Sequence, residues 1–524
     1  MVDGVCLVVC GTEGPMTQTK FVLTKALERG LKPLVVINKV DRNTARVDEV
    51  ENDLLELFCG LDANEDQLEY RTLYASAKNG WATTELGGEE KDILPLLDAI
   101  VEQVPSPKVD RAKPFSMIVT QIESDPYVGK CYLGKIHTGM LRVGDTIKSL
   151  DTEGNIAVQG RVTKILQRKG LEQIPVEEAG AGDIVSVAGI DGAYVNHTIC
   201  APEVTETLPF TDVDAPTISM MFYVNDSPLG GQEGKLLTSQ VLRERLFKEC
   251  ETNVALQVVQ HGEAMEVKGR GELQMGVLIE TMRREGFEIS VTTPRVIYKV
   301  DGEDKDRKIL EPMEEVTIDC SHEDTGTVIE KMSRGKGEMK SYTGEERARL
   351  VFHIPTRGLL GYPAEFKNDT RGEGTLNHIL LGYEPYKGPL EPKRKGSIVS
   401  MATGECTPYA LQDIQVRGKL FVGPGAKVYP GMIIGEANRE HEMECNPVKQ
   451  KQLSNVRSVH KEDKIVLTPP EKMSLERLIA YVQEDEVIEI TPSSIRIRKK
   501  IMDASKRNAE RKRAKNGDGL PQID

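Results

Sequence analysis

Four residues whose types suit nucleotide chemistry directly follow a short apolar run. Residues 34–37 are aliphatic without alternation, and Asn-Lys-Val-Asp occupies 38–41. A carboxylate at Asp41 can accept hydrogen bonds from both N1–H and the N2 amino group of guanine, whereas adenine offers neither donor in that arrangement. The Lys39 stem can lie along the base, and the Asn38 amide can brace the loop and contact the ring. These residues predict a site that reads a guanine base.

A second motif strengthens this interpretation. Ser76, Ala77 and Lys78 end another apolar stretch, RTLYASA. The backbone N–H of Ala77 is in a position to donate to guanine O6. Asn-Lys-x-Asp alone recurs by chance in turns after strands, but two motifs in this order, with a helix-like segment between them, favour a guanine pocket.

The elements that must position these residues are parallel strands. An unbroken aliphatic run such as 34–37 suits a strand buried on both faces, and open α/β sheets bind ligands at the carboxyl ends of their strands. Residues 1–106 alternate strand and helix three times, which predicts a parallel α/β sheet. The phosphate-binding pattern GxxxxGK[ST] does not occur in the 524 residues. Its nearest approach, GGQEGKL at 230–236, has the wrong spacing and no hydroxyl after the Lys.

Later segments follow other patterns. Residues 113–204 contain short alternating strands separated by Gly and Asp, typical of an antiparallel β-barrel. Residues 215–300 and 308–388 each read strand, helix, strand, strand, helix, strand, which predicts two ferredoxin-like domains. Residues 391–504 form a mixed C-terminal domain, and 505–524 form a basic disordered tail.

Composition excludes several classes of protein. No apolar run approaches the ~18 residues that a membrane span requires, so no membrane association is expected. Nine cysteines without CxxC or zinc spacing indicate free thiols in a reducing compartment. The net charge is −14, yet residues 493–515 hold ten Lys or Arg against two acidic residues. This basic end is either an RNA-phosphate contact or a solvated tail.

Several long motifs resemble one known family. They are EGPMTQTKFVL near the start, IPTRGLLGYPAEFKNDTRGEGTLNH at 354–378, RGKLFVGPGAKVYPGMIIGEANRE at 417–440, NPVKQKQLSNVR at 446–457 and DEVIEITPSSIRIRKK at 485–500. They closely resemble the BipA/TypA translational GTPases, which are related to elongation factor G. The resemblance runs from Met1 to about Lys512.

The resemblance implies a multidomain α/β, β and α+β fold. Its parts would be a partial P-loop-type GTP-binding domain, a translation-factor β-barrel, two domains like III and V of elongation factor G, and a BipA-type C-terminal domain. It implies a monomeric, ribosome-associated GTPase that binds GTP or GDP with Mg²⁺ and acts in ribosome assembly or in translation under stress. Such a protein would be cytoplasmic, or would belong to the chloroplast or mitochondrion of a eukaryote.

The resemblance also implies contacts with rRNA and with the tRNA acceptor end. Four residues match the family's loop in that region: Lys449, Lys451, Asn455 and Arg457. Lys and Arg can neutralise phosphates, and an Asn amide can bond base edges or ribose hydroxyls. A solvated loop is the alternative. Four tyrosines could stack on bases, although packing roles are favoured: Tyr383, Tyr386, Tyr409 and Tyr429.

In the family, the phosphate loop and switch segments would precede Met1. We therefore expect no catalytic residue for hydrolysis within these residues, and weak GTP binding at most. Two alternatives remain open. One is a GTP-independent ribosome- or RNA-binding protein, and the other is a metabolic GTP enzyme, which the two ferredoxin-like domains and the Lys-rich C-terminus disfavour.

Overall fold

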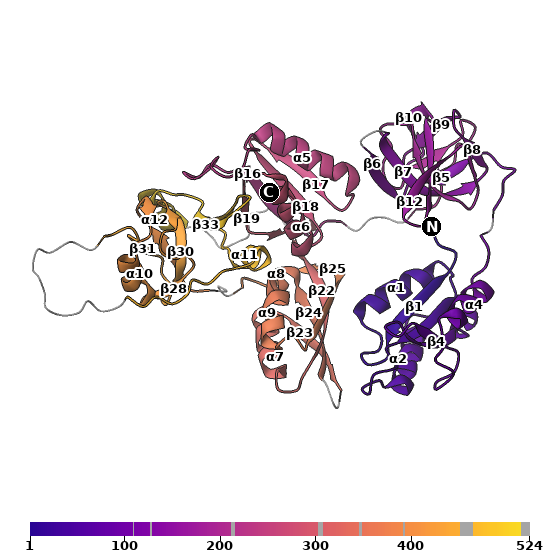
Figure 1. The fold of residues 1–524 in the computed structure, drawn as a ribbon, viewed down its shortest axis with the longest axis horizontal. Helices are drawn as coiled ribbons and strands as arrows, with labels where there is room; N and C mark the ends of the chain where they lie inside the picture. The colour runs from indigo at the N-terminus through magenta and orange to yellow at the C-terminus, as the bar shows by residue number, and fades with distance from the viewer. Residues whose placement is uncertain are drawn as a thin grey trace, which may run out of the picture. The chain divides into compact units, whose positions relative to one another are not determined.

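The computed structural model in Figure 1 describes residues 1–107, 109–125, 128–210, 215–301, 308–344, 348–390, 394–450 and 465–514. The chain divides into two units. The first is mainly Met1–Val213, and the second is mainly Asp214–Cys250, Ala255–Leu376 and Leu380–Asp524. No helix among the described residues is long and apolar enough to cross a membrane.

Residues 1–106 form an open α/β sheet with helices on both faces (Figure 1). Its elements are β1 (Val5–Cys10), α1 (Thr17–Glu28), β2 (Pro33–Asn38), α2 (Val47–Gly60), α3 (Glu65–Leu68), β3 (Arg71–Ser76), β4 (Trp81–Thr83) and α4 (Leu94–Gln103). The strand order is β1-β2-β3-β4, in which β1, β2 and β3 are parallel and β4 is antiparallel to β3. The sequence predicts the parallel strands but not β4, because three residues are too few to show a pattern.

Strand β2 is covered on both faces. Val35 packs with Leu23 of α1 and Phe58 of α2, whereas Leu34 packs with Ala99 of α4. Because successive side chains of a strand point to opposite faces, a strand covered on both sides needs an unbroken apolar run. Helices on both faces therefore fix the carboxyl end of β2.

The rest of the first unit is the predicted antiparallel barrel. Its strands are β5 (Ser116–Ile118), β6 (Gln121–Asp125), β7 (Gly129–Thr138), β8 (Met140–Arg142), β9 (Thr146–Leu150), β10 (Ile156–Arg161), β11 (Lys164–Lys169), β12 (Glu172–Val176), β13 (Glu178–Gly180), β14 (Ile184–Ala188) and β15 (Thr198–Cys200). Their order is β10-β9-β15-β5-β7-β14-β11-β12, with β6 on β7 and a separate β8–β13 pair. Gly134 permits a close backbone approach, since a Cβ there would lie 2.0 Å from the Ile118 carbonyl oxygen.

The second unit begins with a ferredoxin-like fold. Its elements are β16 (Ile218–Val224), α5 (Ser239–Thr252), β17 (Gln257–His261), β18 (Ala264–Gly269), α6 (Glu272–Glu285) and β19 (Ile289–Thr292). The antiparallel order β17-β18-β16-β19 is the one that a ferredoxin-like βαββαβ unit requires.

A second ferredoxin-like fold follows. Its elements are β20 (Arg295–Val296), β21 (Lys299–Asp301), β22 (Lys308–Cys320), α7 (Thr325–Arg334), β23 (Glu338–Thr343), β24 (Ala348–Pro355), α8 (Thr356–Leu359), α9 (Tyr362–Asp369) and β25 (Thr375–Pro385). The sheet runs β21-β22-β24-β23, β25 also pairs with β22, and β20 pairs back to β16. The sequence-predicted fold class, including both ferredoxin-like folds, is confirmed.

The C-terminal block shares a sheet with the first ferredoxin-like fold. Its elements are β26 (Ser397–Ser400), β27 (Gly404–Glu405), α10 (Pro408–Gln415), β28 (Gly418–Leu420), β29 (Lys427–Val428), β30 (Met432–Ala437), β31 (Met443–Cys445), α11 (Leu475–Tyr481), β32 (Glu486–Ile490), β33 (Ile495–Lys499) and α12 (Ala504–Ala514). Strand β32 is antiparallel to β19, with Ile490 opposite Ile289. One sheet therefore runs β17-β18-β16-β19-β32-β33-β30-β26-β31.

Helix α12 replaces part of the disordered tail that the sequence predicts from residue 505. The Asp503 carboxylate accepts hydrogen bonds from the N–H groups of Ser505 and Lys506 at 2.7 and 3.2 Å. Arg507 is only 6% exposed and pairs with Glu442 and Glu444. The expectation was wrong for residues 505–514, because these contacts hold the helix against β31. Residues 515–524 lie outside the described part of the chain.

Candidate functional site

The side chain of Asn38 ties together the loops that follow β2 and β3. Its Oδ1 accepts hydrogen bonds from the backbone N–H of Lys39 at 2.8 Å and of Ala77 at 3.0 Å. Because β2 and β3 are parallel neighbours, their carboxyl ends share one edge of the sheet. The structure therefore brings the 38–41 and 76–78 motifs together, with Asn38 bracing both loops.

The next two polar residues of this loop are the half-buried Lys39 and the exposed Asp41. Lys39 has a φ of 66°, in the left-handed region that costs a residue other than Gly roughly 1 to 2 kcal/mol. Asp41 is exposed, and no hydrogen bond or ion pair holds its carboxylate among the described residues. Strained backbone is often retained at ligand sites. Asp41 is thus a free double acceptor at the end of a buried strand.

The 76–78 loop is buried at its start and exposed beyond it. Ala77 and Lys78 are exposed, whereas Ser76 is 1% exposed and its carbonyl accepts from the N–H of Gly80 at 2.8 Å. The Ser76 hydroxyl has no partner among the described residues. The Ala77 N–H, which the sequence assigns to guanine O6, donates here to Asn38.

A third loop, the one after β1, is tied to the same edge by Arg46, which ends the loop after β2. Sequence patterns do not mark Arg46. Its guanidinium Nε donates to the Thr12 carbonyl at 3.1 Å, and its backbone N–H donates to Gly11 O at 2.9 Å. The N–H of Gly11 in turn donates to the carbonyl of Asn38 at 2.8 Å. No local pattern could reveal Arg46, because this link spans 34 positions. The loops after β1, β2 and β3 are therefore bonded to one another.

Two side chains at this edge carry the groups that the sequence assigns to guanine binding. Asp41 offers acceptors that have no internal partner among the described residues, and Lys39 is half-buried. Tyr74 on β3 connects the sheet to α2 by donating to Glu51. Burial and this hydrogen bond raise the pKa of Tyr74 to about 12, so its hydroxyl stays protonated.

Within the described residues, no group of three or more His, Cys, Asp or Glu could hold a metal ion.

Of the four residues predicted to contact RNA, the structure describes only Lys449. Lys449 is exposed, and its carbonyl accepts from the hydroxyl of Thr407 at 2.6 Å. Thr407 also caps α10 by accepting from the N–H of Ala410. The start of the loop is therefore fixed to α10. Three predicted residues lie outside the described part of the chain: Lys451, Asn455 and Arg457.

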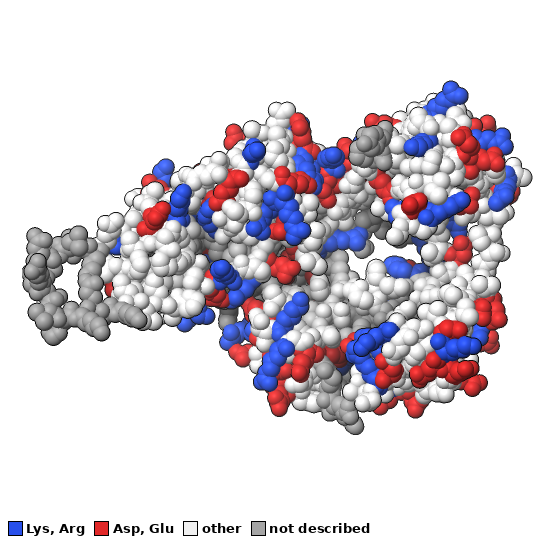
Figure 2. Space-filling model, viewed as in Figure 1, with Lys and Arg blue, Asp and Glu red and all other residues white. Residues whose placement is uncertain are grey.

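The basic C-terminal end is not a free cationic surface. Lys499 is 1% exposed and its Nζ lies 2.8 Å from Asp485 and from Glu486. Arg496, Arg498 and Arg507 also pair with acidic residues. On the face drawn in Figure 2, basic and acidic side chains are interspersed. Four of the ten cations at 493–515 therefore have internal partners, so these four fit neither the predicted RNA-phosphate contact nor the predicted solvated tail.

Packing also accounts for three of the four tyrosines that the sequence offers for stacking, Tyr409 being the exception. Tyr429 is fully buried, and the guanidinium of Arg357 lies 4.5 Å from the ring centroid of Tyr386. The Nζ of Lys299 lies 4.0 Å from the ring centroid of Tyr383. The favoured packing interpretation agrees with these contacts.

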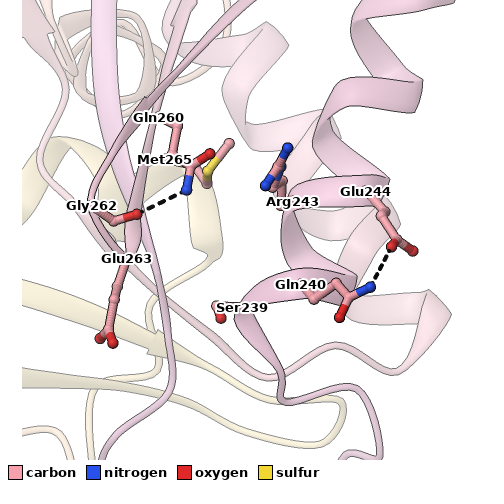
Figure 3. Close-up of a pocket in the computed structure, with 8 residues that line it drawn as sticks. All are labelled: Ser239, Gln240, Arg243, Glu244, Gln260, Gly262, Glu263 and Met265. Atoms are coloured by element: carbon pink, nitrogen blue, oxygen red, sulfur yellow. Dashed lines mark hydrogen bonds between the residues drawn. The ribbon is translucent and has the colours of Figure 1, made fainter.

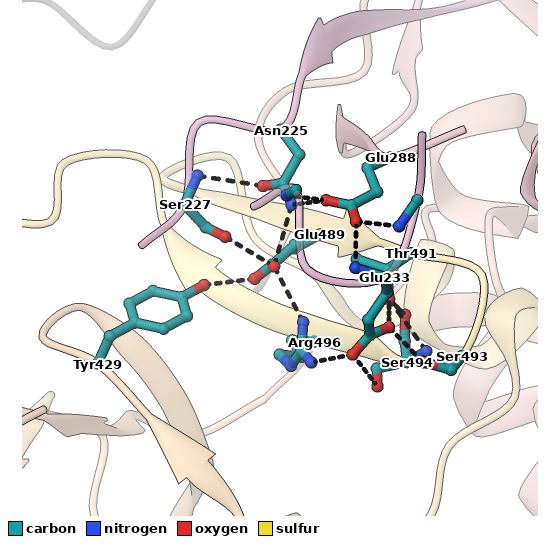
Figure 4. A network of polar contacts seen from close by, with 12 residues as sticks. Asn225, Ser227, Glu233, Glu288, Tyr429, Glu489, Thr491, Ser493, Ser494 and Arg496 are labelled. Carbon is teal, nitrogen blue, oxygen red and sulfur yellow. Dashed lines mark hydrogen bonds and ion pairs between the residues drawn. The ribbon is translucent and has the colours of Figure 1, made fainter. Parts of the chain in front are cut away.

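The Gly-rich stretch at 230–236 binds an anion that the chain itself supplies. The Glu288 carboxylate accepts from the N–H groups of Gly231 at 2.8 Å, Glu233 at 3.0 Å and Gly234 (Figure 4). Successive N–H groups of this kind form an anion-binding nest. Because Glu288 is 1% exposed and fills this nest, the stretch is not available to a phosphate.

A shallow cleft of about 530 Å³ lies between α5 and the β17–β18 hairpin (Figure 3). Its lining includes Ser239, Arg243 and Met265. None of the predicted site residues lies in it.

Comparisons with known proteins cover nearly the whole chain. Residues 1–106 match the elongation factor Tu GTP binding domain, 129–200 match elongation factor Tu domain 2, and 308–394 match the elongation factor G C-terminus. Residues 395–504 match the TypA/BipA C-terminal domain. The protein named large ribosomal subunit assembly factor BipA is 45% identical in Synechocystis sp., over 95% of this chain and 83% of that protein. Its namesake in Bacillus subtilis is 43% identical, over 98% of this chain and 84% of that protein.

This chain belongs to the TypA/BipA family. It is therefore a member of a family of translational GTPases, as the sequence motifs predict, and residues 1–106 belong to its GTP-binding domain. The similarity also extends to Salmonella typhimurium, whose BipA is 42% identical over 99% of this chain. In TypA/BipA terms, the edge formed by the loops after β1, β2 and β3 lies in the GTP-binding domain, and Lys449 lies in the family's C-terminal domain.

Proposed function

We propose that this protein is a ribosome-associated GTPase that acts in assembly of the large ribosomal subunit. Its relatives carry that function in their names, and the similarity covers 95% or more of the chain. The observation that supports the nucleotide part is the free carboxylate of Asp41 beside the Asn38-braced loops. We also propose that the chain is divided into domains at the boundaries that the sequence predicts. These are a guanine-binding part at 1–106, a barrel at 113–204, ferredoxin-like domains at 215–300 and 308–388, and an RNA-facing C-terminal domain at 391–504.

In this proposal Asp41 selects guanine by accepting from N1–H and the N2 amino group. Lys39 lies along the base, and Asn38 holds the loop and contacts the ring. The backbone N–H of Ala77, between Ser76 and Lys78, turns from Asn38 Oδ1 to donate to O6 when guanine binds. A bound GTP or GDP brings its phosphates and Mg²⁺, and the chemistry of hydrolysis takes place at those phosphates.

The RNA part of the proposal rests on Lys449 and its loop. Lys449 is exposed, and Thr407 already fixes the start of its loop. Lys449 can therefore neutralise a phosphate without the entropy cost of ordering that part of the loop. Lys451, Asn455 and Arg457 complete the contact, which we assign to large-subunit rRNA and the tRNA acceptor end. Action under stress conditions belongs to the same proposal.

Co-sedimentation tests ribosome binding. The whole chain should pellet with large subunits or whole ribosomes at low salt. Each neutralised phosphate should steepen the salt dependence by ~0.7 to 0.9 log units per tenfold rise in salt. Changing Lys449, Lys451 and Arg457 together to Ala should flatten that slope, whereas Lys419→Ala, at an exposed position on β28, should not. Absence of pelleting at low salt, or equal effects of both variants, would contradict the proposal.

A further inference from the structure

Residues 225–234, which form most of the connection between β16 and α5, are bonded to β32 and β33, the last two strands among the described residues. We call this loop, together with Glu288 and the β32–β33 hairpin, the carboxylate joint (Figure 4). The loop and the hairpin lie more than 250 positions apart in the chain. The joint therefore connects the first ferredoxin-like fold to the C-terminal block.

Glu489 of β32 is the centre of the joint. It is fully buried, and its carboxylate accepts from Asn225 Nδ2 at 3.1 Å, Ser227 Oγ at 2.7 Å and Arg496 at 3.0 Å. The hydroxyl of Tyr429 donates to its second oxygen. A buried carboxylate persists only where donors surround it, and these donors come from three separate segments.

Glu233 makes the reverse connection from the loop to the hairpin. Its carboxylate accepts from the hydroxyls of Thr491 and Ser493 and, at 3.2 Å, from that of Ser494. The Arg496 guanidinium lies 2.9 Å away and bridges Glu233 to Glu489. Glu288 holds the same loop through backbone N–H groups and also accepts from Asn225.

Apolar packing crosses the same boundary. Ile289 and Val291 of β19 lie opposite Ile490 and Ile488 of β32. A single core cluster contains Phe222 of β16 together with these residues. Without the hairpin, β19 would be an edge with unpaired backbone groups, and the loop carboxylates would lose most of their donors.

We propose that residues 215–300 and the β32–β33 hairpin form one cooperative folding unit, which the carboxylate joint closes only when the C-terminal strands are present. Because synthesis proceeds from the N-terminus, the first ferredoxin-like fold stays incomplete until residue 499 has been made. The joint also makes this fold and the C-terminal block move as one body.

Native-state hydrogen exchange of the whole chain across a urea series tests the proposal without any substitution. Amides of β16 and β18 should lose protection with the same urea dependence as amides of β32, while β7 of the barrel follows its own. Protection of β16 and β18 that survives urea concentrations at which β32 and β33 exchange freely would overturn the proposal.

A variant adds an independent test. Arg496→Ala removes the bridge between Glu233 and Glu489, so exchange should accelerate at least tenfold in β16 and β18 as well as in β33. The matched control is Arg284→Ala, which removes an exposed pair with Glu280 inside α6 and should leave both regions unchanged. If the variant unfolds the second unit completely, loss of protection in β16 with an unchanged barrel supports the proposal. Acceleration confined to β30, β32 and β33 would overturn it.

Discussion

The loop after β2 carries a motif typical of guanine sites, and the loop after β16 holds the chain's nearest approach to a phosphate-binding pattern, yet the two loops use their polar groups in opposite ways. In the loop after β2, Asn38 satisfies the backbone while Asp41 remains exposed and unpaired among the described residues. In the loop after β16, successive N–H groups of the kind that bind phosphate are bonded to Glu288. A polar motif therefore indicates a ligand only where the fold leaves its donors or acceptors free.

The largest expected effect on stability lies in the carboxylate joint. Glu489→Ala should reduce the free energy of unfolding of the second unit by about 3 to 5 kcal/mol, because several donors would lose the buried acceptor that they share. These donors are Asn225, Ser227, Tyr429 and Arg496. Urea unfolding monitored separately in each unit measures this. Glu178→Ala, which removes an exposed pair with Arg142 in the barrel, is the control and should cost less than about 1 kcal/mol. Similar losses for the two variants would mean that the joint contributes no special stability.

Acid should affect the same region next. Burial opposes ionisation of Glu233, but hydrogen bonds from Ser493 and Thr491 and the charge of Arg496 lower its pKa to about 2. Backbone N–H groups likewise lower the pKa of Glu288 despite its burial. Because both folded-state pKa values lie below the unfolded value of 4.5, this stabilisation is complete above about pH 4.5 and is lost as the pH falls toward 2.

A pH series of urea unfolding checks this expectation. The second unit should lose stability between about pH 4.5 and pH 2, and Glu233→Gln should flatten that dependence. An unaltered pH profile in Glu233→Gln would show that other carboxylates control the acid response.

In the loop after β2, Asn38 should contribute more to the free energy of unfolding than Asp41. Asn38→Ala removes two hydrogen bonds to backbone N–H groups and should cost about 1 to 2 kcal/mol in the first unit. Exchange at the amides of Lys39 and Ala77 should accelerate. Asn79→Ala, an exposed Asn in the adjoining loop, is the matched control. Unchanged exchange at Ala77 would show that the two loops are not coupled through Asn38.

Sequence patterns predicted what depends on neighbouring residues. The unbroken run 34–37 marked a strand covered on both faces, and alternating strands and helices marked both ferredoxin-like folds. The pairing of Ile289 with Ile490 left no local pattern, because residues so far apart meet only in the folded chain. Lys499 and Arg507 looked like tail cations, since a sequence gives a charge but not its partner.

The same distinction applies within the candidate site. The sequence identified Asn38 and Ala77 separately, and their hydrogen bond follows from the parallel pairing of β2 and β3. Arg46 remained unrecognised because Arg in a loop is usually solvated, and its bond to Thr12 depends on the β1 loop.

The smallest stability effect is expected at Asp41. Asp41→Ala should change the free energy of unfolding by less than about 0.5 kcal/mol, because the side chain is exposed and unpaired among the described residues. Thermal unfolding measures this. A larger loss would mean that Asp41 has a structural role, and the contrast with the carboxylate joint would then fail.

Base selectivity at Asp41 tests the central claim most directly. Nucleosides titrated into the whole chain and observed by saturation-transfer NMR report base binding alone. Guanosine should bind about 10- to 100-fold better than adenosine, because hydrogen bonds to a charged group contribute about 1.5 to 3 kcal/mol. Asp41→Asn should shift the preference toward xanthosine, whose O2 accepts where guanosine N2 donates, and Asp41→Ala should abolish the preference. Equal binding of guanosine and adenosine, or a preference that Asp41→Asn leaves unchanged, would contradict the account.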